Sequence, residues 1–358
     1  FLESSPISGA STLITRAPRS DKIIVQYGPT KTLVRSTTNK FFKGPSIIST
    51  SFPYIDSSAQ VQFNIIIINK KGKTMLRKIT LYLSSIIIAF SIVGSAYAVT
   101  LKASHQWPGT PRADGSFDPR HEMVQIIADE VKKANVDLEI RIYPAKSLYK
   151  PKEQWKPMTT GQLDISAFPL AYASKFHPEF DATLMPGTVK NHEHALRFNK
   201  GPMMTEIKKI ISDAGVVVLS DAWLGGGFAS KTKCIKNPSD AKGQVMRAAG
   251  KAFNQMLEAA GAGIQSMPSS EIYTGLQTGV LTGANTSSGS FVSYKIYEQV
   301  KCATPPGKFG LWFMYEPILM SKKSYNALNS SQQVALMKAG KVAEKYMTAQ
   351  VENLDKKF

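Results

Sequence analysis

One segment in the first third of the chain determines which residues can form the mature folded protein. Met75-Leu76-Arg77-Lys78 is a basic start, Ile79 to Val93 is mostly apolar, and Ala96-Tyr97-Ala98 has a small-x-small pattern. This order is typical of a secretory signal peptide with its cleavage site. A membrane anchor is the weaker alternative, because the unbroken apolar run is shorter than the roughly 20 residues of a spanning helix. We therefore predict a signal peptide over residues 75–98, cleavage before Val99 and secretion of the mature chain.

Residues 1–74 precede this signal, although a signal peptide acts from the N-terminus of a protein. They begin with Phe and show no sustained periodicity. We therefore interpret residues 1–74 as a disordered, non-native upstream extension and Met75 as the true start. The alternative is a small native N-terminal domain. The run Ile65-Ile66-Ile67-Ile68 could be a strand of such a domain, but we expect nothing around it to supply a partner.

The formal net charge of +18 raises the question of nucleic-acid binding. Residues 1–98 hold 12 Lys and Arg against 3 Asp and Glu, and the mature part holds 32 against 23. The excess in the mature part is nearly all lysine, spread along the chain without interleaved aromatic residues. This pattern favours a solvated basic surface, so no nucleic-acid partner is predicted.

From Val99 onward the sequence alternates strand and helix patterns. Strands are expected at residues 99–104, 138–143, 163–168, 215–219 and 228–231, and helices after Asp118, before Thr160, before Asp213, at 252–260, after Ser269 and at 330–354. Strands that alternate with helices predict mostly parallel α/β sheets. Asp118 is the expected N-cap of the first helix, with Pro119 at its first position. In the C-terminal helix we expect an apolar face that includes Val334, Met337, Val342, Tyr346 and Val351.

Sequence motifs for catalysis are missing from this chain. It has no Gly-x-Ser-x-Gly, no phosphate loop, no His-Glu-x-x-His and no Cys-x-x-Cys. His192 and His194 are two positions apart and would point to different sides of a helix, so no metal site is predicted. Gly225-Gly226-Gly227 is not followed by a helix, which favours close approach of backbones in a sheet over an anion loop. No cofactor is predicted, and the chain is not expected to be an enzyme.

A block of about forty residues in the second half of the mature chain carries a family pattern. Lys-Gly leads into a strand that ends in Arg, followed by Gly-Ala, Glu-x-Tyr and Leu-Gln-x-Gly. The matching residues are Lys242-Gly243, Arg247, Gly261-Ala262, Glu271-x-Tyr273, Leu276-Gln277-x-Gly279 and Gly283. This block resembles the DctP-like periplasmic solute-binding subunits of TRAP transporters. Thr282 stands where that family commonly has Asp.

The resemblance implies a fold and a function. The fold is a two-lobed periplasmic-binding architecture, with residues 99–220 mainly in lobe 1, residues 221–310 mainly in lobe 2, and the C-terminal segment across both. The function is to capture a small organic acid and deliver it to TRAP membrane permease subunits. An ABC-type receptor is one alternative. A secreted α/β hydrolase is another, and it would need a base from His105, His121, His177, His192 or His194.

Arg247 is the expected anchor of the ligand's carboxylate. It is one of only five arginines after residue 98, and Ala248-Ala249-Gly250 leave space beside it. A guanidinium can grip a carboxylate through two parallel hydrogen bonds, which lysine cannot do. Without the family resemblance, a surface salt bridge would be the favoured role. Other candidates follow the expected strands or match cleft positions of the family: His105, Gln106, Trp107, Lys150, Phe168, Tyr172, Trp223, Asn285 and Ser287.

The chain has two cysteines, Cys234 and Cys302, and both lie after expected β-segments of the second lobe. An isolated pair in an oxidising compartment is often bridged, so a disulfide is predicted. Two separate buried thiols are the alternative. The spacing does not suggest a zinc site.

Overall fold

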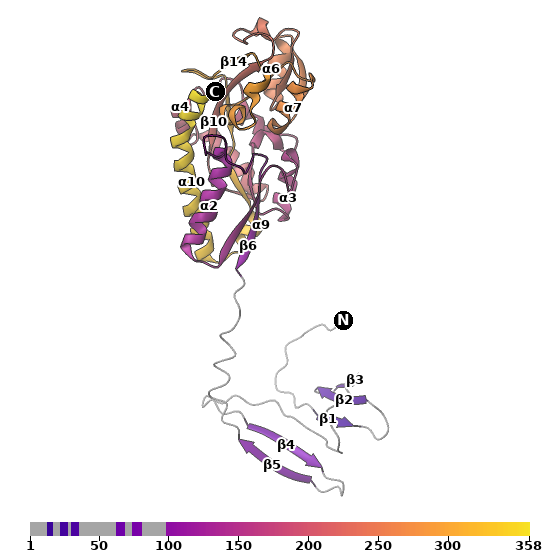
Figure 1. Cartoon of the computed structure of the whole chain (residues 1–358). Helices are drawn as coiled ribbons and strands as arrows, with labels where there is room; N and C mark the ends of the chain where they lie inside the picture. Colours follow the sequence, from indigo (N-terminus) through magenta and orange to yellow (C-terminus); the bar gives the residue numbers. More distant parts are fainter. Residues whose placement is uncertain (1–12, 17–21, 28–29, 36–61, 69–73, 81–97) are drawn as a thin grey trace. The chain divides into compact units, whose positions relative to one another are not determined.

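The computed structural model describes residues 13–16, 22–27, 30–35, 62–68, 74–80 and 98–358, in two compact units that divide after Ala96 (Figure 1). In the first unit, β1 (Leu13–Arg16), β2 (Lys22–Tyr27) and β3 (Thr30–Arg35) pair antiparallel in sequence order. β4 (Gln62–Ile68) pairs antiparallel with β5 (Thr74–Thr80). The expectation that Ile65–Ile68 has no partner nearby is therefore wrong. Most of the predicted signal peptide, residues 81–97, lies outside the described residues.

The second unit contains two mixed sheets, and each forms one lobe. The sheet of lobe 1 has the order β7-β6-β8-β16-β9. β6 pairs parallel with β7 and β8, whereas β16 pairs antiparallel with β8 and β9. The chain thus returns to lobe 1 near its end, after it has built lobe 2. The bounds are β6 (Val99–Ser104), β7 (Leu138–Tyr143), β8 (Ile165–Ala167), β9 (Val216–Ser220) and β16 (Ile318–Ser321).

The sheet of lobe 2 has the order β12-β11-β13-β10-β14, and β15 also pairs with β10. β11 pairs parallel with β12 and β13, and β10 pairs antiparallel with β13, β14 and β15. Arg247 lies in the parallel part of this sheet, so we expect a binding site beyond the carboxyl end of β11. The bounds are β10 (Trp223–Ser230), β11 (Val245–Ala248), β12 (Gly263–Ser266), β13 (Gly283–Ser287), β14 (Cys302–Thr304) and β15 (Trp312–Tyr315).

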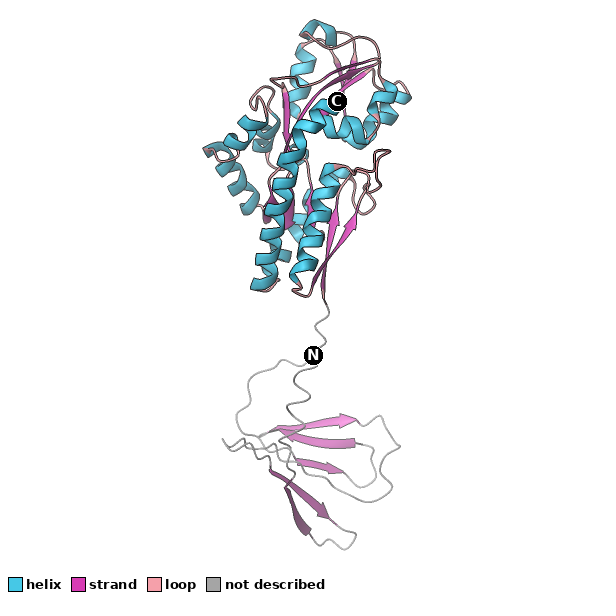
Figure 2. Ribbon diagram, turned by 60° about the vertical axis from the view of Figure 1, so that its left-hand side comes forward, coloured by secondary structure: helices cyan, strands magenta, loops and turns pink. Residues whose placement is uncertain are grey.

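Helices cover both sheets (Figure 2). In lobe 1 they include α2 (Pro119–Ala134), α3 (Trp155–Thr160), α5 (Pro202–Asp213) and α9 (Lys322–Asn326), and in lobe 2 α6 (Lys251–Ala259), α7 (Ile272–Gln277) and α8 (Ser288–Ser293). α4 (His192–Phe198) contacts β10, and α10 (Ser330–Lys357) contacts elements of both lobes. α10 also lies beside α2 (Figures 1 and 2). The predicted two-lobed α/β fold with a long C-terminal helix is confirmed.

The start of α2 follows from its sequence. The Asp118 side chain accepts a hydrogen bond from the Arg120 backbone N–H, and Pro119 occupies the first helical position. Asp118 is the N-cap that the sequence predicts, because its short carboxylate satisfies a backbone donor that the helix leaves free. This cap also fixes Arg120 in the interior of the molecule.

The apolar face expected for α10 is only partly right, because Val351 is buried and Met337 and Tyr346 pack against the core, but Val334 and Val342 do not. Val334 is 67% exposed and Val342 is 37% exposed, whereas the buried residues include several small ones, such as Ala335, Ala339 and Ala343. A Cβ atom added at Gly340 would lie 2.0 Å from the Leu219 carbonyl oxygen of β9. At Gly340 the helix therefore packs closely on the sheet because a small residue stands there.

The glycine run in β10 has a steric reason. A Cβ at Gly226 would lie 2.1 Å from the Thr286 carbonyl oxygen, and one at Gly227 would lie 1.9 Å from the Thr304 carbonyl oxygen. The run lies inside a strand, so the predicted close approach of backbones is confirmed. In the described part of the chain, no helix is long and apolar enough to cross a membrane.

Candidate functional site

Arg247 lies in β11 and is 1% exposed, so it is not a surface salt-bridge residue. Its Nε donates to the Met267 carbonyl oxygen at 2.9 Å, and its Nη1 donates to the Asn285 carbonyl oxygen at 2.9 Å. Its Nη2 donates to the Tyr172 hydroxyl oxygen at 3.1 Å. Burial lowers the pKa of the guanidinium, while the Tyr172 oxygen opposes this shift. Among described residues Arg247 forms no ion pair, so a buried cation has only neutral acceptors and two of its five N–H groups remain available.

Tyr172 connects lobe 1 to Arg247 of lobe 2. It lies in the 3-10 helix η2 (Leu170–Ala173), and its hydroxyl oxygen also accepts from the Ser269 backbone N–H of lobe 2 at 3.1 Å. The Phe168 ring packs edge-on against the Tyr172 ring with centroids 6.2 Å apart. The structure thus brings together three of the sequence candidates, Arg247, Tyr172 and Phe168, from two lobes.

Lys152 is a second cation beside Arg247, and the sequence did not single it out. It lies in η1 (Pro151–Glu153) of lobe 1, and its Nζ lies 5.8 Å from the centroid of the Tyr172 ring. Its Nζ donates to Ser266 of lobe 2, to Oγ at 3.2 Å and to the carbonyl oxygen at 3.4 Å. Burial lowers the pKa of Lys152, and the charge of Arg247 lowers it further. The Lys150 side chain, by contrast, is 79% exposed and lies 3.7 Å from a Glu153 oxygen.

Two buried amides come from opposite lobes. Gln106 is 2% exposed and Asn285 is 0% exposed, and neither amide side chain has a hydrogen-bond partner among the described residues. The backbone of each joins the site: the Asn285 carbonyl accepts from Arg247, and the Gln106 carbonyl accepts from the Tyr294 hydroxyl at 2.9 Å. A buried amide without a partner costs about 1–3 kcal/mol. Both amides are therefore suited to bind a polar ligand.

Arg120 forms a separate buried ion cluster where the lobes meet. Its Nη2 lies 2.6 Å from Asp118, and its Nη1 lies 3.0 Å from Glu316, which precedes β16. Nη1 also donates to Ser287 and Ser290 of lobe 2, at 3.0 and 3.2 Å. Burial raises the pKa of Glu316 against the opposing effect of Arg120. For Asp118, burial would raise the pKa, but the Arg120 charge and hydrogen bonds bring it below its usual value.

Several residues that the sequence named as ligand-binding candidates lie in or beside this ion cluster. Ser287 is buried and hydrogen-bonded to Arg120 and Ser290, and the Arg120 guanidinium lies 4.3 Å from the centroid of the Trp107 ring. His105 contacts His121 at 3.1 Å. Burial, together with the charge of His121, lowers the pKa of His105 to about 3, so its ring is neutral at neutral pH. Ser287 and Trp107 thus contact the interior ion cluster, and His105 lies beside Trp107 and His121.

Trp223 occupies a different environment. Its ring packs against Tyr315 and Phe198, and its Nε1 donates to Asn199 at 3.5 Å. It lines a pocket with residues of α4 and α10, including His192 and Glu344. No described hydrogen bond or ring contact joins it to Arg247. His192 contacts Asp355 of α10 at 2.6 Å, and residues 98–358 contain no cluster of His, Cys, Asp and Glu that could hold a metal ion.

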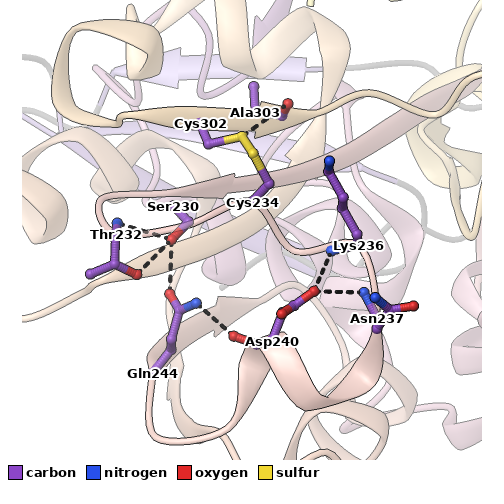
Figure 3. The surroundings of a disulfide bond; sticks show 9 residues. All are labelled: Ser230, Thr232, Cys234, Lys236, Asn237, Asp240, Gln244, Cys302 and Ala303. Carbon is purple, nitrogen blue, oxygen red and sulfur yellow. Dashed lines mark hydrogen bonds between the residues drawn. A yellow bond between two sulfur atoms is a disulfide. The ribbon is translucent and has the colours of Figure 1, made fainter.

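The two cysteines form a disulfide that connects the segment after β10 to β14 (Figure 3). Nearby, the Ser230 hydroxyl donates to Gln244, whose amide donates to the Asp240 carbonyl oxygen. Gln244 directly precedes β11, the strand that contains Arg247. Thr282 holds the start of β11 from the other side, because its hydroxyl accepts from the Val245 N–H at 2.8 Å, which an Asp carboxylate could also do.

The chain was compared with known families and proteins. Residues 113–358 match the family model of bacterial extracellular solute-binding proteins, family 7, known as DctP. The chain belongs to this family. A solute-binding protein of Albidiferax ferrireducens is 38% identical over 254 residues, which cover 70% of this chain and 75% of the relative. The C4-dicarboxylate-binding periplasmic protein DctP of Rhodobacter capsulatus is 26% identical over 258 residues, or 70% and 74% of the two chains.

Solved structures agree with this assignment. A TRAP periplasmic solute-binding protein of Rhodoferax ferrireducens with bound malonate is 36% identical, with a TM-score of 0.68 over 71% of this chain and 80% of that chain. A TRAP protein of Sulfitobacter with bound galacturonate is 20% identical and supports the fold alone, with a TM-score of 0.65 over 72% and 83%. This DctP-family protein is therefore a TRAP-type solute-binding protein and not an enzyme. Members of the family are periplasmic.

Proposed function

We propose that this protein binds a small organic acid between its lobes through the guanidinium of Arg247 and delivers it to the membrane permease subunits of a TRAP transporter. The observation that carries this proposal is the surroundings of Arg247. It is fully buried, forms no ion pair among described residues and uses three of its N–H groups on neutral oxygens. A ligand carboxylate would supply the missing negative charge through charge-assisted hydrogen bonds.

The neighbouring groups suit the rest of such a ligand. Tyr172 and Phe168 supply an aromatic side from lobe 1, and the unpartnered amides of Gln106 and Asn285 supply donors and acceptors from both lobes. We retain Lys150, Trp223, Ser287, His105 and Trp107 as weaker candidates, because their described contacts lie away from Arg247 or within the Arg120 cluster. Export through a cleaved signal peptide over residues 75–98 is part of the same proposal.

Calorimetric titration tests the proposal. The protein of residues 99–358 is first screened by thermal shift against organic acids, starting with malonate and galacturonate, the ligands of the two related structures. A ligand that binds the folded state raises the midpoint by mass action. Arg247→Ala should lose on the order of 2–5 kcal/mol of binding free energy, roughly thirtyfold to several thousandfold in Kd. Arg247→Lys keeps a charge but not the planar fork, so it should bind more weakly than the parent and more tightly than Arg247→Ala.

The control is the unliganded melting midpoint of each variant. Arg247 is buried and donates to Met267, Asn285 and Tyr172, so a lower midpoint is expected for Arg247→Ala, and binding is compared at a temperature where both proteins are folded. If Arg247→Ala folds and binds the acid as tightly as the parent, the assigned recognition is wrong. If no organic acid shifts the parent's midpoint, the proposed ligand class is wrong.

A further inference from the structure

Two loops of the second unit expose large apolar side chains. One loop runs from the 3-10 helix η3 (Pro178–Leu184) to α4, and the other joins β14 to β15. Met185 of the first loop is 46% exposed, and Phe309 and Leu311 of the second are 63% and 42% exposed. Side chains of this kind are normally buried, so their exposure close together needs a reason.

Backbone hydrogen bonds hold the two loops side by side. The Gly187 N–H donates to the Leu311 carbonyl oxygen at 2.9 Å, and the Gly310 N–H donates to the Lys190 carbonyl oxygen at 2.8 Å. The exposed residues of both loops therefore form one surface, which we call the Phe309 patch. It consists of Met185, Lys190, Lys308, Phe309 and Leu311.

The fold leaves no room for Phe309 to turn inward. Gly310 is buried, and a Cβ atom there would lie 2.7 Å from the Phe313 ring. Trp312 and Phe313 are buried in the core, and β15 holds them by pairing with β10. The disulfide at Cys302 fixes the start of β14 at the other end of the loop. The exposure of Phe309 is thus set by the fold around it.

The charge of these two loops is only positive. Residues 182–192 and 299–315 contain Lys190, Lys301 and Lys308 but no Asp or Glu. Lys190 and Lys308 are exposed, and neither belongs to an ion pair among the described residues. The Lys308 Nζ lies 5.6 Å from the centroid of the Phe309 ring, so a cation and an apolar side chain share one place. A partner of this patch should be both apolar and anionic.

A lipid surface fits this combination better than a protein does. Lysine is depleted in protein–protein interfaces, and a stable interface buries about 800 Å² on each partner, more than three exposed apolar side chains provide. A bilayer requires no matching shape. It accepts aromatic and aliphatic side chains among its headgroups, where lysines keep their ammonium groups at the anionic surface.

We infer that the Phe309 patch binds a phospholipid surface with anionic headgroups. Phe309 and Leu311 enter the headgroup region, and Lys190 and Lys308 pair with the phosphates. This membrane contact is a function separate from the capture of an organic acid, and it does not rest on the role of Arg247.

Vesicle sedimentation without added acid tests the inference. The protein of residues 99–358 is used, because the apolar run of residues 79–93 could bind lipid by itself and because residues 97–358 form a compact unit. The vesicles contain phosphatidylcholine alone or with about 30% phosphatidylglycerol, which supplies the anionic headgroups. The variants are Phe309→Ala, Lys308→Gln and a matched control, Phe176→Ala. Phe176 is also exposed and has the Lys175 Nζ 4.7 Å from its ring centroid, but the exposed Glu179 follows it.

We expect the parent to bind the anionic vesicles about tenfold or more tightly than the neutral ones, with the difference reduced at about 0.5 M salt. Phe309→Ala should weaken binding to anionic vesicles by about tenfold, because less apolar surface leaves water. Lys308→Gln should weaken it by about fivefold and leave binding to neutral vesicles unchanged. Phe176→Ala should match the parent.

A parent that sediments with neither kind of vesicle overturns the inference, and the Phe309 patch would then be available to a protein such as the permease. Equal losses in Phe309→Ala and Phe176→Ala also overturn it, since any exposed aromatic side chain would then serve. Urea unfolding checks that Phe309→Ala is as stable as the parent. If it is less stable, Lys308→Gln, which changes only an exposed side chain, decides the test.

Discussion

The disulfide between Cys234 and Cys302 should contribute a large share of the stability of lobe 2. The two residues are 68 positions apart, so the bond closes a long loop in the unfolded chain. The loop-entropy relation gives on the order of 4 kcal/mol for a loop of this length. Replacing both cysteines by serine should lower the free energy of unfolding by about that amount. With an m-value of roughly 2–3 kcal/mol/M, the urea midpoint should fall by about 1–2 M.

Equilibrium urea unfolding of the parent and the Cys234→Ser/Cys302→Ser variant measures this effect. The matched control is the double alanine variant, which distinguishes the loss of the bond from the polarity of serine near the partly buried Cys302. Thiol titration of the unfolded parent without reductant should find no free thiol. The reasoning is refuted if two thiols titrate, or if both double variants unfold at the same urea concentration as the parent.

Three further predictions concern the interior. Gly340→Ala should lower the free energy of unfolding by about 1–3 kcal/mol in urea unfolding, because its Cβ would overlap the Leu219 carbonyl, and a stabilised variant would contradict this packing. His105 is neutral when folded and titrates with a pKa of about 3, so stability should fall by about 2 kcal/mol between pH 7 and pH 5 as the unfolded state takes up a proton. His105→Gln should remove most of this loss in urea unfolding at the two pH values, and an unchanged loss would argue against it. Arg120→Met leaves Asp118 and Glu316 buried without a cation, so it should lower the free energy of unfolding by about 3–5 kcal/mol in the same assay. An unchanged free energy of unfolding would mean that the cluster is not structurally important.

Much of the fold could be predicted because the signals are local. The Asp118 cap, the helices and the strands each depend on residues close in sequence, and the structure has them near the predicted positions. The α10 face was predicted only in part, because its packing also depends on small residues, and Gly340 permits close packing by having no side chain. The antiparallel positions of β10 and β16 were not foreseen, since sheet order depends on pairings between distant segments.

For the candidate site, the sequence predicted some of the residues in contact and missed others. Arg247 and Tyr172 were named from a family pattern and from the end of a strand, and the structure places them in contact. Lys152 was missed in favour of Lys150, two positions away in the same loop. Which of two neighbouring lysines turns inward depends on the turn of η1, and neither charge nor spacing reveals it. Arg120 was missed for a similar reason, because its partner Glu316 is 196 positions away in the chain.

The hydrogen bonds that cross between the lobes have a consequence for how fast a ligand can leave. Tyr172 to Arg247, Lys152 to Ser266, Tyr294 to Gln106 and Arg120 to Ser287 each join residues of different lobes. A molecule bound against the buried Arg247 would dissociate only after these contacts break together and the lobes separate. Its dissociation rate would then be set largely by this opening step, so that a tight acid and a moderately tight acid could have similar residence times. We expect stopped-flow measurements to find such a ceiling on release, which a permease that holds the lobes apart could remove.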